Sequence, residues 1–392
     1  MNKHILNTEP QDFINQNLNA DIAKLIFKGS PFKNITVQEL VEQIEAKKKA
    51  MHKLPTWFAT ENIYYPNKLN IEQTSSETTA NYKANLISGE TIIDLTGGFG
   101  VDALAFANAF KQVTHCEIDS KLSSIAKHNF KALNIQNINT INDDGVGFLK
   151  RKKQQFDCIN IDPSRRNDVK GKVFLLEDCE PNVPENLSTL FNFSDNIMVK
   201  VSPMLDITSA ISELNFVKEI HVVAIQNEVK ELLFILEKGF KSNIKIKTVN
   251  IKKETIESFD SSWLKNNIPA QLSEPLTYLY EPNSAILKAG LFNEVSHQLK
   301  VFKLNTNSHL YTSNNLILFP GRRFKIINKV SYNLKEIKKA LVSKQANITT
   351  RNFPETVAQI RKKTKLKEGG DHYLFFTKDV NDNHIVLICE KV

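Results

Sequence analysis

The sequence predicts an α/β protein whose core is a Rossmann-like parallel sheet between residues 71 and 240. Three observations predict this fold class. The chain has 392 residues, more than one hydrophobic core usually organises. From residue 91 onward, short apolar strand patterns alternate with amphipathic helix patterns, as in right-handed βαβ units. A glycine-rich turn directly follows the first of these strands.

Residues 1–70 are expected to form a helical N-terminal domain. Residues 11–18 and 21–27 are short amphipathic stretches. Thr36 and Glu39 have the spacing of a capping box, which predicts a helix running toward Lys49. Residues 54–65 are rich in aromatic side chains, and we expect a loop that packs on another part of the protein.

The core is expected to contain six strands, at residues 91–95, 112–117, 138–141, 156–161, 196–201 and 219–225. Helix patterns lie between them, at residues 101–110, 121–133, 146–152 and 207–214. Residues 228–238 fit a helix or a final antiparallel strand, and we favour the strand.

The chain beyond residue 240 is expected to form one or two small α+β modules. Residues 244–251 alternate apolar and basic side chains like a half-exposed strand. Further strands are expected at 299–304, 316–319, 373–377 and 384–389, with a lysine-rich helix at 334–341.

Composition excludes several classes of protein. Hydrophobic residues make up 41% and charged residues 24%, as in ordinary globular domains. No apolar run approaches the ~20 residues of a membrane span, and the N-terminus lacks a signal-peptide pattern. The four cysteines form no CxxC pair, which argues against a zinc site and for a reduced compartment. We therefore expect a cytoplasmic protein without a metal or a membrane partner.

The positive charge is concentrated near the C-terminus. Residues 321–370 hold 14 Lys and Arg but only three Glu. The net positive charge of this block is therefore larger than the net charge of the whole chain, which is +8. Such asymmetry favours a polyanionic partner, most plausibly RNA. The alternative is a lysine-rich surface that is merely solvated.

The strongest chemical signal is the glycine-rich turn at residues 94–100, Asp-Leu-Thr-Gly-Gly-Phe-Gly. Gly98 and Gly100 allow a sharp turn and the close approach of a ligand, and the amides of the following helix favour a polar or anionic group. Asp94 can accept a hydrogen bond from an ammonium. A dinucleotide fold is less natural, because position 103 is Ala where GxGxxG has its third glycine.

Two acidic positions follow the next two strands. Glu117 lies 17 residues after Gly100, close to the spacing of an acid that binds ribose hydroxyls; the alternative is a solvated loop acid. Asp144 can accept from an adenine amino group while the Gly145 amide meets a ring nitrogen. Asp143 or Asp144 can instead cap the following helix.

The fourth element is Asp162-Pro-Ser-Arg-Arg166, directly after a strand. A carboxylate and a Pro-fixed carbonyl can accept hydrogen bonds from an amine and orient its lone pair. The alternative is a strand-ending turn whose two arginines pair with surface acids.

The order of these motifs resembles that of the class I S-adenosylmethionine (SAM)-dependent methyltransferases, in which Asp/Asn-Pro-Pro-aromatic after the fourth strand marks methylation of base nitrogens. Here Ser164 replaces the second Pro and Arg165 the aromatic, which leaves the acceptor atom open. The resemblance implies a catalytic set of Asp162, Pro163, Ser164 and Arg165. It implies SAM as cofactor, contacted by Thr74, Ser75, Asp94, Thr96, Gly97, Gly98, Gly100, Glu117, Ile118, Asp144 and Gly145. Thr74 and Ser75 can equally serve as helix caps.

More narrowly, the chain resembles bacterial methyltransferases that end in a ferredoxin-like module and a THUMP-like domain, with a core similar to trimethylguanosine synthases. The residues that suggest this include Lys200-Val-Ser-Pro203, residues 227–233, Tyr280-Glu-Pro-Asn283, Arg351-Asn-Phe-Pro354 and residues 369–371. The resemblance places a ferredoxin-like module at residues 241–318 and a THUMP-like domain at 319–392.

These patterns together favour a SAM-dependent methyltransferase acting on a base nitrogen of tRNA or rRNA. Two alternatives come from other classes: an RNA-binding protein with a vestigial or regulatory SAM pocket, and a methyltransferase for small molecules or proteins. The sequence contains no GxSxG, HExxH or P-loop pattern, which argues against the common classes of hydrolase and P-loop NTPase.

Overall fold

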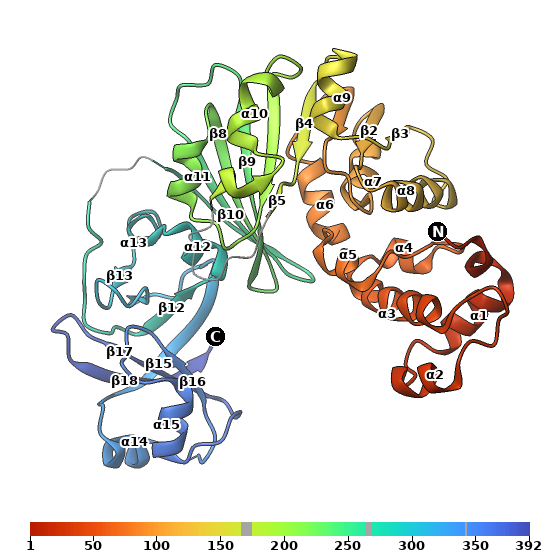
Figure 1. Ribbon diagram of the computed structural model, residues 1–392. Coiled ribbons are helices and arrows are strands. Elements are labelled where there is room, and N and C mark those ends of the chain that lie inside the picture. Colours follow the sequence, from red (N-terminus) through yellow and green to blue (C-terminus); the bar gives the residue numbers. More distant parts are fainter. Residues whose placement is uncertain (166–174, 264–267, 342) are drawn as a thin grey trace. The chain divides into compact units, whose positions relative to one another are not determined.

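The computed structural model describes residues 1–165, 175–263, 268–341 and 343–392 (Figure 1). The chain divides into two compact units. Unit 1 comprises residues 1–218 and 233–241, and unit 2 comprises residues 219–232 and 242–392. Among the described residues, no helix combines the length and apolarity that crossing a bilayer requires.

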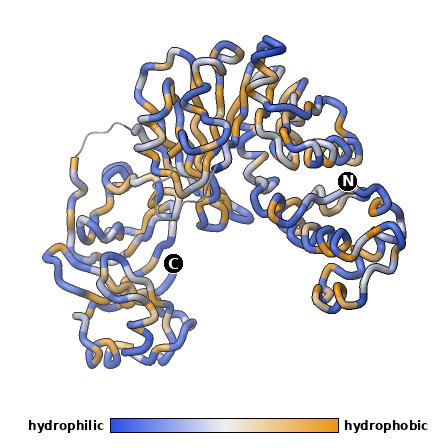
Figure 2. The backbone as a smooth tube through the Cα atoms, viewed as in Figure 1, coloured by the Kyte–Doolittle hydropathy of each residue, from blue (hydrophilic) through white to orange (hydrophobic). Residues whose placement is uncertain are grey.

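The N-terminal part of unit 1 is helical, as predicted. It contains a 3-10 turn, η1 (Lys3–Leu6), and six α-helices: α1 (Thr8–Gln16), α2 (Ile22–Lys28), α3 (Val37–Lys53), α4 (Pro55–Ala59), α5 (Lys68–Gln73) and α6 (Glu77–Ala84). The capping box of Thr36 and Glu39 opens α3, and α1, α2, α4 and α5 all contact this helix. Hydrophobic positions recur along α3 between hydrophilic ones (Figure 2), because only one of its faces is covered.

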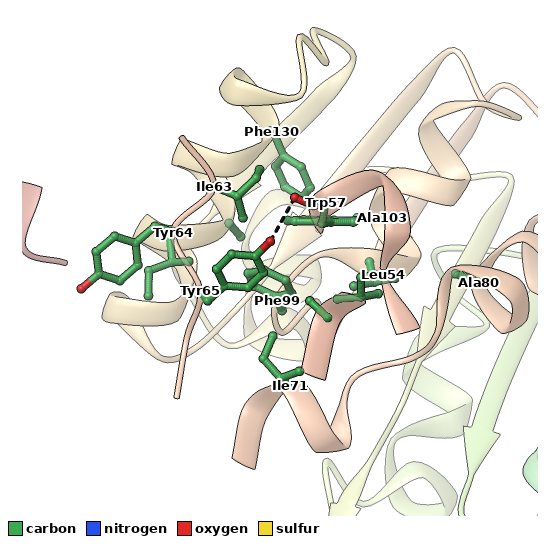
Figure 3. Packing of buried hydrophobic residues seen from close by; sticks show 14 of the residues in the cluster. Leu54, Trp57, Ile63, Tyr64, Tyr65, Ile71, Ala80, Phe99, Ala103 and Phe130 are labelled. Atoms are coloured by element: carbon green, nitrogen blue, oxygen red, sulfur yellow. Dashed lines mark hydrogen bonds between the residues drawn. The ribbon is translucent and has the colours of Figure 1, made fainter. Parts of the chain in front are cut away.

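The aromatic segment at residues 54–65 packs on the core of unit 1 (Figure 3). The Trp57 ring lies 4.4 Å from that of Phe99 and 6.5 Å from that of Phe130. The Tyr65 hydroxyl donates to the Trp57 carbonyl oxygen at 3.0 Å. The packing was predicted, but the prediction of a loop is only partly right. Pro55 starts the short helix α4 within this segment.

The sheet of unit 1 has the predicted parallel core. Strands β1 (Thr91–Asp94), β2 (Gln112–Cys116), β3 (Ile138–Ile141), β4 (Cys158–Ile161) and β7 (Asn196–Val201) follow the spatial order β7-β4-β1-β2-β3. Every neighbouring pair is parallel. The connecting helices are α7 (Val101–Ala107), α8 (Ser120–Ala132), α9 (Gly145–Lys152), α10 (Val183–Leu190) and α11 (Ile207–Glu213). Helix α10 was not predicted.

A hairpin of β8 (Val217–Ile225) and β9 (Glu228–Glu237) follows, so the strand favoured for residues 228–238 is confirmed. Gln226 and Asn227 form its two-residue turn with positive φ, as a type I′ turn requires. Three short elements also lie between β4 and α10: β5 (Ser164–Arg165), η2 (Leu176–Asp178) and β6 (Cys179–Glu180), with β5 and β6 antiparallel.

Unit 2 contains β10 (Lys245–Ile251) and β11 (Ile256–Ser262). Strand β10 pairs with β8 in parallel and with β11 in antiparallel orientation. A second sheet has the order β13-β14-β12-β15-β18-β17-β16. Its strands are β12 (Tyr278–Pro282), β13 (Phe302–Lys303), β14 (Tyr311–Ser313), β15 (Gly321–Ser331), β16 (Asn347–Thr350), β17 (His372–Lys378) and β18 (His384–Lys391). The helices of this unit are α12 (Ser284–Ala289), α13 (Phe292–Leu299), α14 (Leu334–Ala340) and α15 (Val357–Thr364).

Strands β17 and β18 of the second sheet are covered on both faces, and their alternate side chains enter two different apolar clusters. Phe375 and Leu387 belong to an apolar cluster with Leu304 and Leu310. Leu374 and Phe376 join a cluster with residues of α14 and α15. The strand expected at residues 316–319 is wrong, since these residues form no regular element, and only Phe302 and Lys303 of residues 299–304 are a strand.

Candidate active site

Apart from Thr74 and Ser75, which lie between α5 and α6, the predicted site residues lie at or just beyond the carboxyl ends of parallel strands in unit 1. Strand β1 pairs with β2 on one side and with β4 on the other. The chain therefore leaves β1 and β4 in opposite directions along the sheet, which creates the switch point where open α/β sheets bind ligands.

The three glycines after β1 have different structural roles. A Cβ on Gly97 would overlap the His115 ring of β2, and a Cβ on Gly100 would overlap the Phe130 ring of α8. These two glycines allow close packing of the turn. Gly98 has φ +55°, and a Cβ there would meet only the Thr96 carbonyl oxygen, at an ordinary van der Waals distance of 3.9 Å. Gly98 is therefore the glycine whose surface is available to a ligand.

Asp94 ends β1 in almost complete burial, with 2% of its surface exposed. Burial, with Asp102 as the next cause, raises the pKa of its carboxyl to about 7. Its Oδ1 accepts from the Thr96 amide at 3.2 Å. In register beside it, Asn160 of β4 is 1% exposed, and within the described residues its Oδ1 has no hydrogen-bond partner.

Thr96 joins the glycine turn to the Asp-Pro turn. Its hydroxyl oxygen accepts from the Asp162 amide at 2.7 Å. Pro163 is buried, while Ser164 and Arg165 are exposed on β5, and Arg166 lies outside the described residues. The carboxylate of Asp162 forms an ion pair with Lys200, the penultimate residue of β7.

Glu117 follows β2 and lies against the glycine turn. Its Oε2 accepts from the Gly98 amide at 2.8 Å and its Oε1 from the Asp119 amide at 2.7 Å. Partial burial raises the pKa of this carboxyl above its ordinary value. The next residue, Ile118, is 73% exposed, so an apolar surface without a covering side chain adjoins the acid.

Asp144 is the N-cap of α9, since its Oδ2 accepts from the Gly147 amide at 2.8 Å. The capping role considered from the sequence is thus the one that the structure contains. The side chain remains exposed. Gly145 is buried, and a Cβ there would overlap the backbone of Leu95, so this glycine sets α9 close to the end of β1.

A buried ionic cluster adjoins the site, and sequence reasoning missed it. Lys83 of α6 is wholly buried and lies 3.0 Å from Asp102 at the start of α7. The Ser75 hydroxyl binds both partners, at 2.8 Å to Lys83 Nζ and 2.9 Å to Asp102 Oδ2. Of the two predicted hydroxyl residues, only Ser75 joins this cluster; Thr74 is the C-cap of α5. A lysine on the apolar face of a helix was the signal that could have revealed it.

Three family models match parts of the chain. Residues 321–391 match a THUMP domain-like family, residues 278–320 a ferredoxin-like domain and residues 77–178 a spermine/spermidine synthase domain. A crystal structure from Porphyromonas gingivalis W83, of a proposed methyltransferase, is similar over 100% of this chain and 98% of its own, with 30% identity and a TM-score of 0.90. This chain therefore belongs to the SAM-dependent methyltransferases with a C-terminal THUMP-like domain.

Two curated relatives agree with this family. A Mycoplasma mobile protein named as an uncharacterized RNA methyltransferase is 34% identical over 37% of this chain and 41% of its own length. A Mycobacterium tuberculosis protein named as an uncharacterized SAM-dependent methyltransferase is 19% identical over 76% of this chain and 80% of its own. This chain thus spans less than half of the first relative.

The residues of this methyltransferase fit its cofactor, SAM. The ligand carries an ammonium, ribose hydroxyls and an adenine ring. The buried carboxyl of Asp94 and the unpartnered oxygen of Asn160 suit a hydrogen-bond donor. Glu117 offers carboxylate oxygens, Ile118 offers an uncovered apolar side chain, and Gly98 offers a backbone surface that no side chain crowds. None of the His, Cys, Asp and Glu residues that the structure describes form a set of three able to hold a metal.

The motifs of the methyltransferase outside its core serve the packing of unit 2. Glu281 is 4% exposed and pairs with Arg322 at 2.5 Å and Arg351 at 2.6 Å. Asn283 donates to Glu257 at 3.2 Å, and Asn227 Oδ1 accepts from the Ser284 amide at 2.8 Å. These contacts join segments far apart in the sequence, which explains the motifs without a catalytic role.

Proposed function

We propose that this methyltransferase modifies a base nitrogen of RNA, in tRNA or rRNA. The observation that carries the proposal is the Asp162 turn, which is hydrogen-bonded to Thr96 of the glycine turn. This contact holds the Asp162 turn, which carries the proposed acceptor-binding carboxylate, against the proposed cofactor-binding turn at the neighbouring strand end.

In this proposal, the strand ends of unit 1 hold SAM. Asp94 and Asn160 receive the ammonium, Ser75 lies toward the methionine carboxylate, and Glu117 accepts from the ribose hydroxyls. Ile118 packs on the adenine, whose edge meets the Gly145 amide and the exposed Asp144. When bound, SAM supplies an electrophilic methyl carbon at its sulfonium.

Asp162 is proposed to orient the acceptor. Its carboxylate and the carbonyl of the Asp-Pro turn accept hydrogen bonds from the amino group of a base, which directs the nitrogen lone pair along one line. Arg165 replaces the stacking aromatic of related motifs. Its guanidinium plane is exposed and can stack on a base or bind a phosphate. Rate enhancement then comes from positioning and charge complementarity.

The basic surface of unit 2 supports RNA as the substrate class. Helices α14 and α15 contact each other, and their apolar residues Ile337 and Ile360 share one cluster on the sheet. Their outer positions hold exposed lysines, namely Lys335, Lys338, Lys339, Lys362 and Lys363. Such a surface attracts phosphates without sequence preference, and one relative is named as an RNA methyltransferase.

The test is methyl transfer from labelled SAM to fractionated cellular RNA, followed by nucleoside mass spectrometry. We expect label in one methylated base, and none with Asp162→Ala, which should retain SAM affinity. Label in protein or small metabolites, with none in RNA, would contradict the substrate class. Full activity of Asp162→Ala would contradict the acceptor role of this residue.

Charge reversal separates RNA binding from chemistry. Lys362→Glu with Lys363→Glu should raise KM for RNA about tenfold at physiological salt and flatten its salt dependence, because phosphate contacts are lost. The matched control is Lys24→Glu with Lys28→Glu, two exposed lysines of α2. Equal effects of the two pairs would indicate general electrostatics rather than a THUMP-like RNA surface.

A further inference from the structure

The ion pair of Lys200 and Asp162 connects two neighbouring parallel strands at the proposed acceptor site. Asp162 directly follows β4, and Lys200 lies near the end of β7. Ile161 and Val199 are partners in the register of these strands, so the two charged residues each lie one position beyond a fixed pair. The Lys200 side chain is 14% exposed and that of Asp162 34%.

The environment of Lys200 requires a partner of opposite charge. A largely buried ammonium loses most of its hydration, and an uncompensated buried charge is costly. The side chains of the flanking β7 residues Val199 and Val201 point to the opposite face of the sheet and are buried there, so β7 is covered on that face while Lys200 reaches the carboxylate on the other.

The backbone of the Asp162 turn is held by other contacts. The Asp162 amide donates to Thr96, Pro163 is buried and has a restricted φ, and β5 pairs with β6. The turn therefore does not need Lys200 to keep its path. Lys200 donates to the side-chain carboxylate of Asp162, at Oδ2.

We propose that Lys200 is a positioning residue for methyl transfer. It fixes the rotamer of the Asp162 carboxylate, so that the remaining exposed part of this group faces the incoming amine in one orientation. This inference rests on the proposed acceptor role of Asp162. Since misplacement by about 1 Å can cost about 100-fold in rate, a freely rotating carboxylate should lower kcat much more than it changes substrate affinity.

The test compares variants of Lys200 with labelled SAM and the cellular RNA fraction that accepts methyl groups. Lys200→Met should lower kcat at least tenfold, with the SAM Kd and the RNA KM changed less than threefold. Lys200→Arg should restore most of kcat. In an Asp162→Asn background, Lys200→Met should have little further effect, because both changes remove the same interaction.

The matched control is Lys218→Met, which removes a lysine paired with Glu237 at 2.5 Å elsewhere in unit 1; its kcat should equal that of the wild type. A crystal structure of Lys200→Met should show the Asp162 turn unmoved and its carboxylate in a new rotamer. An unchanged rotamer, or unchanged kcat in Lys200→Met, overturns the inference. If Asp162→Ala itself remains active, the proposed function of the turn has failed instead.

Discussion

The pKa of Asp94 makes SAM affinity depend on pH in a defined direction. Its carboxyl is buried at the end of β1 with a pKa of about 7, far above the usual ~3.9. Below pH 7 the group is mostly neutral, and above pH 7 it is mostly ionised. The ammonium of SAM favours the ionised form of Asp94. Binding of SAM should therefore release a proton from Asp94 when the pH is below the pKa of this carboxyl.

The size of the effect follows from this pKa. The ionised fraction of Asp94 falls from about one half at pH 7 to about 0.01 at pH 5, so the Kd for SAM should rise roughly 50-fold over this range. His115, next to the turn, has a pKa lowered to about 4 by complete burial and therefore stays neutral throughout. Glu117 has a raised pKa and is the other group that can contribute.

Isothermal titration with SAM at pH 5, 6 and 7 measures this dependence, and buffers of different ionisation enthalpy count the proton released. Asp94→Asn should bind SAM weakly with a nearly flat pH profile, whereas Glu117→Gln should keep most of the slope. A wild-type Kd that is constant between pH 5 and 7, or a steep slope that survives in Asp94→Asn, would refute the role of Asp94.

Two further predictions concern the turn and unit 2. Gly98→Ala should fold with a cost of about 1 kcal/mol for a side chain at positive φ but lose at least tenfold in SAM affinity. Gly290→Ala, also at positive φ with open space around it, should cost the same and bind SAM normally; urea unfolding and titration compare the two. Glu281→Gln should lower the unfolding free energy by roughly 1–3 kcal/mol, since Arg322 and Arg351 lose their common carboxylate, and an unchanged urea midpoint would contradict this.

The sequence was most informative where local pattern and function coincide. The glycine turn after β1 was located because Gly98 and Gly100 lie directly between a strand pattern and a helix pattern. The parallel strands were located because fully buried strands are short and rich in apolar residues, as in β4, where all four residues are buried and three of them are apolar. The capping box of α3 could be read directly, because capping is a contact between residues three positions apart.

Elements held by distant contacts could not be located in this way. Residues 316–319 are apolar, but Phe319 is buried beside Tyr280 and Tyr311 whereas Leu316 and Leu318 are exposed, so this apolar run does not mark a buried strand. The pair of β5 and β6 spans residues 164–180, and two-residue strands carry no periodicity. The domain boundaries and the roles of the site residues stay predictions.

The amino-acid sequence alone determined the fold class, because this depends on the short-range periodicity of strand and helix patterns, and the resemblance of its motifs indicated the family. Only the tertiary structure decided which groups meet. It placed Thr96 on the Asp162 amide, Lys200 on the Asp162 carboxylate, and Lys83 with Ser75 and Asp102. It also decided that Gly97 and Gly100 serve packing while no side chain crowds Gly98. Such side-chain contacts depend on strand order and burial, and the spacing of residues along the chain does not predict either property.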